Sequence, residues 1–132
     1  MPADPTPILF VYTTVAREDE ARRLAEDLIA AGLAACVNIG APVTSLFRWE
    51  SSQDGDSGGD EDGSADQPAS AAAVQSEREI PLVIKTTRDA YAALERRIRE
   101  IHPYELPEIV AVPVDRGLPA FLAWIEEAVS AS

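Results

Sequence analysis

Two prolines constrain the fold of this chain strongly, because they force a helix to end and a strand to begin within a few residues. Pro103 disfavours helical backbone at His102, and Pro107 has no N–H group to donate to a sheet. An apolar stripe at helical spacing precedes them: Tyr91, Leu94, Ile98 and Ile101. The apolar run 109–114 follows and is typical of a buried strand. We therefore predict that His102–Glu108 is a rigid turn carrying a histidine, a tyrosine and two carboxylates.

The remaining apolar patterns predict the order strand, helix, strand, strand, helix, strand, helix. This order is typical of an α+β fold, a ferredoxin-like split βαβ sandwich (β-α-β-β-α-β) with an added C-terminal helix. The predicted strands are 8–13, the long extended segment 33–49 with a bend at 40–42, 80–86 and 109–114. The predicted helices are 17–31, 87–101 and 119–128.

The helix ends show several local signals. Gly32 is expected to end the first helix, which has no convincing side-chain N-cap. Thr86 or Thr87 can cap the second helix, with Asp89 three residues after Thr86 as in a capping box. Pro81 is expected near the start of its strand, where a missing N–H matters least, and Pro119 in the first turn of the last helix.

One segment, 51–76, differs from the rest in composition. It consists mainly of Ser, Gly, Asp and Ala, with six acidic residues and no Lys or Arg. Such a segment cannot bury enough apolar surface to offset its ordering entropy, so we predict a flexible acidic insertion within a single domain, 1–132. Its acidic runs do not fit the ligand spacing of an EF-hand loop in either possible frame.

Composition narrows the class of protein. The 132 residues carry a net charge of −12, of which the acidic segment supplies half. An acidic chain is not expected to bind nucleic acid or an anionic membrane surface, and no apolar run is long enough to span a bilayer. The N-terminal sequence lacks the pattern of a signal peptide and there is a single cysteine, so we expect a cytoplasmic protein.

Each polar candidate residue allows two interpretations. His102 can bind a metal or cap the end of its helix, where its positive form would suit the dipole. Cys36 can be a buried core residue or a reactive thiol. Tyr104 and Glu105 can line a cleft between subunits or orient their own turn. Lys85 can bind an anion or pair with a carboxylate.

Catalysis has little support in the sequence. We find no recognisable nucleophile–base arrangement, and the glycines of the acidic segment lack the strand–helix context and the lysine of a phosphate-binding loop. We therefore expect a protein that is not an enzyme. A hydrolase that uses Cys36 remains a minor alternative.

Several motifs resemble the CutA divalent-cation tolerance proteins, in the same order along the chain. They are Thr13-Thr14, Leu33-Ala34-Ala35-Cys36-Val37-Asn38, Val43-Thr44-Ser45-Leu46-Phe47-Arg48-Trp49-Glu50, Ile84-Lys85-Thr86 and His102-Pro103-Tyr104-Glu105-Leu106-Pro107-Glu108. The resemblance extends from Ile8 to Ala128 and is interrupted only by the acidic segment.

This resemblance implies a compact homotrimer, similar in architecture to PII-type signalling proteins, with a role in tolerance to divalent metals, copper above all. In that family, long strands pair with neighbouring subunits, so Trp49 is expected to be an interface anchor. The positions that bind copper in the family are occupied here by Thr13, Ile101 and His102.

Of these three residues, only His102 has a side chain that copper prefers as a ligand. We therefore predict a metal site from His102, Glu105 and Cys36, and a ligand cleft or signature formed by Tyr104, Lys85 and Trp49. The main functional hypothesis is a non-enzymatic homotrimer that binds divalent cations, with copper as the candidate ion. The alternative is a PII-like small-molecule sensor or scaffold, whose acidic loop binds a partner.

Overall fold

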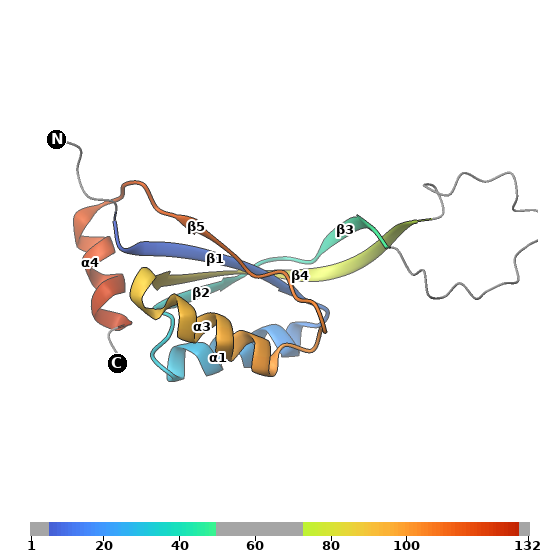
Figure 1. Ribbon diagram of the computed structural model, residues 1–132, viewed down its shortest axis with the longest axis horizontal. Helices are drawn as coiled ribbons and strands as arrows, with labels where there is room; N and C mark the ends of the chain where they lie inside the picture. The colour runs from blue at the N-terminus through green and yellow to red at the C-terminus, as the bar shows by residue number, and fades with distance from the viewer. Residues whose placement is uncertain (1–5, 50–72, 130–132) are drawn as a thin grey trace, which may run out of the picture. The chain divides into compact units, whose positions relative to one another are not determined.

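The computed structural model describes residues 6–49 and 73–129 (Figure 1). The chain divides into two compact units, Met1–Pro42 with Glu79–Ser132 and Val43–Arg78. Its elements, in order, are β1 (Ile8–Val15), α1 (Glu18–Ala30), β2 (Cys36–Ile39), β3 (Val43–Arg48), β4 (Val74–Thr87), α3 (Arg88–Ile101), β5 (Val110–Pro113) and α4 (Pro119–Ala128).

The sheet of the first unit has the strand order β2-β4-β1-β5, and β1 pairs antiparallel with β4 and β5, as β2 does with β4. Val11, in the middle of β1, lies opposite Ile84 on one side and Ala111 on the other. The first and fourth strands are thus central and each is joined to an outer strand through a helix, as the split βαβ pattern requires. The predicted ferredoxin-like fold is confirmed.

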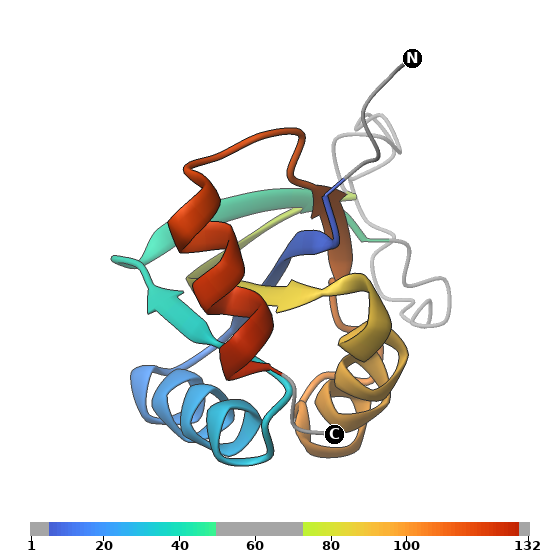
Figure 2. The same ribbon diagram turned by 90° about the vertical axis from the view of Figure 1, so that its left-hand side faces the viewer.

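One face of this sheet is covered by α1 and α3, which lie side by side in Figure 2. Side chains alternate along β1, so Val11 and Val15 point to these helices, and both are fully buried. The same core contains buried residues of β4 and the two helices: Ala21, Leu24, Ala25, Leu28, Ile80, Leu82, Ile84, Leu94 and Ile98. Burial of these side chains on one face fixes the register of the sheet.

The opposite face, which we call the open face, is covered only in part. Ile8 packs there against Ile125 and Val129 at the C-terminal end of α4, and all three are buried. Further along the same face, Tyr12 is 36% exposed and Val110 and Val112 are each 48% exposed. The register confirms that they share a face, since Tyr12 pairs with Val110 and Phe10 with Val112.

The described part of the second unit is a two-stranded ribbon, formed by β3 and the first part of β4. The backbone N–H of Trp49 donates to the carbonyl of Ala73 at 2.7 Å. The Trp49 ring meets that of Phe47 edge to face, with 6.3 Å between centroids, and is 56% exposed. Leu46 and Val74 are 69% and 60% exposed, so the ribbon presents apolar side chains to solvent.

The predicted strand 80–86 was too short. Strand β4 begins at Val74, because its first residues pair with β3, so the last three residues of the predicted irregular segment 51–76 are strand. Residues 51–72 of that segment lie outside the described residues. Pro81 is correspondingly in the middle of β4 and not near its start, and its carbonyl accepts the Gly40 N–H at 2.9 Å.

The predicted helix ends are mostly confirmed, with one correction. Helix α1 has no side-chain N-cap, and Gly32 follows it with φ 76°. The cap of α3 is Thr87, whose hydroxyl accepts the Ala90 N–H at 3.2 Å. Thr86 instead points into the core and donates to the Leu33 carbonyl at 2.8 Å, so the capping box with Asp89 does not form.

Candidate functional site

The turn after α3 is held by the ring of His102. This residue ends the helix in extended backbone, with φ −73° and ψ 136°, as expected before a proline. Its Nδ1 accepts the Tyr104 N–H at 3.0 Å, and its Nε2 lies 2.8 Å from the Thr14 carbonyl oxygen. A carbonyl only accepts hydrogen bonds, so Nε2 carries the proton and the neutral tautomer satisfies both contacts.

The buried position of His102 sets its charge. Only 8% of the residue is exposed, and burial lowers the pKa of the ring below its ordinary value of 6.5. The Thr14 carbonyl, Glu20 and Glu79 act in the opposite direction but do not outweigh burial. His102 is therefore a neutral residue that joins the turn to the end of β1. The predicted capping of its own helix by a positive ring is wrong.

A carboxylate that sequence analysis missed completes this arrangement. The hydroxyl groups of Tyr104 and Thr14 both lie within hydrogen-bond distance of the same Glu79 oxygen, at 3.0 and 3.2 Å. The Tyr104 ring meets the His102 ring edge to face, with 4.8 Å between centroids. Glu79 is one residue beyond the β1–β4 pairing, so only the strand register could have revealed it.

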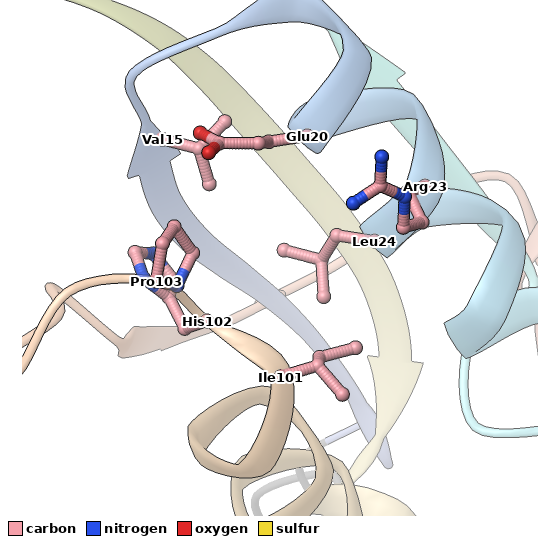
Figure 3. Close-up of a pocket in the computed structure, with 7 residues that line it drawn as sticks. All are labelled: Val15, Glu20, Arg23, Leu24, Ile101, His102 and Pro103. Carbon is pink, nitrogen blue, oxygen red and sulfur yellow. The ribbon is translucent and has the colours of Figure 1, made fainter.

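A small cavity of about 100 Å³ adjoins His102 (Figure 3). The end of β1, the start of α1 and the turn surround it, through Val15, Glu20, Arg23 and Pro103 among others. Among the described residues, one Glu20 oxygen and the Thr13 hydroxyl are buried without a hydrogen-bond partner. A cavity of this size and polarity suits a few water molecules.

The three residues of the predicted metal site do not come together. Cys36 starts β2 and lies opposite Lys85, whereas the Thr14 carbonyl that contacts His102 belongs to the residue opposite Pro81. Four residues of β4 separate those positions, about 13 Å at the usual strand rise. The same separation leaves the Cys36 thiol without His102 as a base for hydrolysis.

The donor groups also fit a metal cage poorly. Both ring nitrogens of His102 already have partners, and Glu105 is exposed on the turn. Thr13 is 1% exposed, and a buried hydroxyl is a poor ligand for copper. Within residues 6–49 and 73–129 no cluster of three or more His, Cys, Asp or Glu side chains could hold a metal ion.

The other predicted site residues lie in three places. Tyr104 belongs to the His102 turn, whereas Trp49 belongs to the ribbon of the second unit. Lys85 lies on the open face, and its Nζ is 5.4 and 5.7 Å from the ring centroids of Phe10 and Phe121. These two rings stabilise the charge of Lys85, because an aromatic ring attracts a cation through its quadrupole.

A family model described as "CutA1 divalent ion tolerance protein" matches residues 9–57 and 71–128 of the chain. Residues 58–70, within the acidic segment, separate the two matched stretches. In the part of the chain that the structure describes, no helix is both long and apolar enough to cross a membrane.

Curated relatives and solved structures agree with this match. The "Divalent-cation tolerance protein CutA" of Thermus thermophilus is 35% identical over 89% of this chain and 93% of its own length. That of Archaeoglobus fulgidus is 32% identical over 91% and 96%. The crystal structure of CutA1 from Oryza sativa covers 97% of this chain and 98% of its own, with a TM-score of 0.77 and 30% identity. The chain therefore belongs to the CutA1 divalent ion tolerance family.

Proposed function

We propose that this protein is a non-enzymatic divalent-cation tolerance protein that works as a homotrimer. The observation that carries the proposal is the family match, which extends over both sides of the acidic segment and includes the His102 turn. The geometry supports a role without catalysis, because Cys36 and His102 are held apart by the sheet. The PII-like alternative gains no support from the comparisons.

The open face supports the proposed assembly. Tyr12, Val110 and Val112 leave apolar surface exposed there, and Phe121 and Trp124 of α4 are 40% and 45% exposed. Exposed apolar side chains gathered in this way usually mark an interaction surface. Second and third copies of the chain would cover them, and the apolar ribbon that carries Trp49 would supply further contacts.

Assembly is tested by light scattering at micromolar concentration. We expect the wild-type chain to have the mass of a trimer, and Val112→Asp to dissociate it because a charge would be buried. Ile29→Asp is the matched control, because Ile29 is 45% exposed on α1, away from the open face. A monomeric wild-type chain, or equal dissociation by both variants, would contradict the proposed interface.

We propose that divalent cations bind weakly at the His102–Glu108 turn and that Cu²⁺ binds more tightly than Zn²⁺. A cation would have to displace one of the two hydrogen bonds of His102, and Glu105 is the exposed carboxylate beside it. Cu²⁺ leads the usual order of affinity for imidazole and carboxylate donors.

Calorimetric titration of the metal-free protein with Cu²⁺ and Zn²⁺ tests this site. We expect saturable uptake that His102→Gln and Glu105→Gln weaken and that Cys36→Ser leaves unchanged. Circular dichroism of each variant checks that the fold is retained. Uptake that depends on Cys36, or that His102→Gln leaves unaltered, would exclude the proposed contact.

Tolerance itself is tested in cells. A host that lacks its own family member should grow at higher copper concentrations when it carries this gene than when it carries an empty vector. We propose a cytoplasmic location, supported by the single cysteine. The names of relatives differ on this point, since one structure is called periplasmic and the Arabidopsis relative chloroplastic. Fractionation of the native cells decides between these locations.

A further inference from the structure

A second cleft, of about 500 Å³, lies between the outer surface of α3 and the turn that follows it. We call it the α3 cleft. Its polar lining consists of Glu95, Arg96, Arg99, Glu100, Tyr104 and Glu105. It is distinct from the cavity beside His102, which the opposite side of the turn and α1 enclose. Its volume is in the usual range for a small-molecule site.

Two arginines of this cleft are free to bind a ligand. Arg96 and Arg99 are three residues apart on α3, so their side chains emerge as neighbours on one side of the helix. Both are exposed, and among the described residues neither forms an ion pair or a side-chain hydrogen bond. The dipole of the helix accounts for a cation in the last turn, but Arg96 lies further back than that.

The neighbouring carboxylates of α3 have other partners. Glu100 accepts a hydrogen bond from Arg97 at 3.2 Å. Burial, and next the hydrogen bond to Glu95, raise the pKa of Tyr91, so Glu95 is engaged by the Tyr91 hydroxyl. These interactions leave the charges of Arg96 and Arg99 less compensated than the sequence of α3 suggests.

Both walls of the cleft are held in place by contacts outside it. The Tyr104 hydroxyl is 3.0 Å from Glu79, and its ring packs against His102. Helix α3 is tied to α1 by Arg97, which makes two hydrogen bonds to Asp27 at 2.7 and 2.8 Å. A site on rigid elements loses less conformational entropy when a ligand binds.

We propose that the α3 cleft binds a small oxyanion with at least two negative charges, through the guanidinium groups of Arg96 and Arg99. Guanidinium groups form paired, charge-assisted hydrogen bonds with carboxylate or phosphate oxygens. Both kinds of oxyanion offer this chemistry, so a polycarboxylate and a phosphate are the two sources to separate. Glu105, at the rim of the cleft, opposes the anion and limits its affinity.

Calorimetric titration with citrate and with inorganic phosphate tests the proposal. The protein is freed of metal on a chelating resin, since a soluble polycarboxylate chelator would itself compete, and the buffer holds little salt. We expect saturable binding of at least one probe, and the tighter of the two identifies the source. The double variant Arg96→Gln/Arg99→Gln should weaken it by at least about tenfold, through loss of two charge-assisted contacts.

Two further variants make the test specific. Arg22→Gln/Arg116→Gln removes the same charge from exposed residues that pair with Glu26 and Asp115, and should change affinity by less than about twofold. Glu105→Gln should tighten binding, because it removes a repulsive charge. Absence of saturable binding by either probe, equal losses in the two double variants, or weaker binding by Glu105→Gln would each overturn the proposal. No metal is present, so these failures would leave the proposed cation tolerance unaffected.

Discussion

The two faces of the central sheet are completed in different ways. The face toward α1 and α3 buries Val11, Leu82 and Ile84 entirely within the chain's own core. The open face is covered by α4 around Ile8 and Phe10, whereas Val112 further along is 48% exposed. One face therefore stabilises the subunit by itself, whereas the other leaves apolar surface for a further partner.

The candidate chemistry follows the same division. Cys36 and Lys85 are opposite each other on the open face. By strand alternation, the side chains of Thr14 and Glu79 leave the sheet on that side too. The turn after α3 is joined to this end of the sheet by the contacts of His102 with Thr14 and of Tyr104 with Glu79. Packing residues and polar residues thus alternate along the same strands.

The largest contrast should come from the same substitution on each face. Val11→Ala removes fully buried methyl groups and should lower the free energy of unfolding by about 2 kcal/mol. Val112→Ala, on a half-exposed residue, should lower it by less than about 1 kcal/mol and act mainly on assembly. Denaturant unfolding at several protein concentrations separates the two effects. If both variants lower the free energy of unfolding equally at every protein concentration, the two faces do not differ as proposed.

Removing the ring that joins the turn to the sheet should have the next largest effect. His102→Gln leaves the Thr14 carbonyl or the Tyr104 N–H without its partner, and should cost about 1–3 kcal/mol. Unfolding by denaturant at neutral pH measures this loss. An unchanged midpoint would show that these two hydrogen bonds do not hold the turn.

The same residue should also make stability depend on pH. The pKa of His102 is lower in the folded protein than its ordinary 6.5, so the unfolded chain binds the proton first as pH falls. The contribution is fully present above about pH 6.5 and is lost as pH falls toward the folded pKa. Between pH 7.5 and 5.5 the free energy of unfolding should therefore fall more in the wild type than in His102→Gln. Parallel curves would contradict a neutral, buried ring.

Helix α3, which carries the turn, depends on its cap. Thr87→Ala should lower the free energy of unfolding by about 1 kcal/mol, because the Ala90 N–H loses its acceptor. Helix α1 offers the opposite experiment, since Arg17 occupies its N-cap without a side-chain hydrogen bond. Arg17→Ser should therefore stabilise the protein slightly. Thermal unfolding of both variants measures the two signs.

The smallest effect is expected at Lys85 on the open face. Lys85→Gln removes a cation from Phe10 and Phe121 and should cost about 0.5–1 kcal/mol. Lys85→Arg, which keeps the charge, is its control and should recover most of the loss. If both variants unfold like the wild type, the aromatic contacts of Lys85 do not contribute to stability.

Most elements of the fold could be predicted from local patterns. Apolar periodicity and prolines placed α1, α3 and α4 within a few residues of their observed bounds, and Gly32 marked the end of α1. The start of β4 was missed because the five residues after Val74 are polar and are strand only through pairing with β3. Local composition carries no information on such a partner.

The candidate site was predictable only in part. The turn at His102 follows from Pro103, since the backbone restriction is local. The partners of its ring are Tyr104, two residues away, and Thr14, 88 residues away. Glu79 could not be predicted either, because its position beside Thr14 depends on the register of β1 and β4.

The sequence by itself determined the α+β class, the rigid turn and the family, because these depend on local backbone restrictions and on the order of motifs. Tertiary structure alone decided what the polar residues do. It separated Cys36 from His102 along β4, supplied both ring nitrogens of His102 with partners, and left Arg96 and Arg99 facing a cleft. Distances between residues far apart in sequence are set by strand register and helix packing, and they determine which side chains can act together.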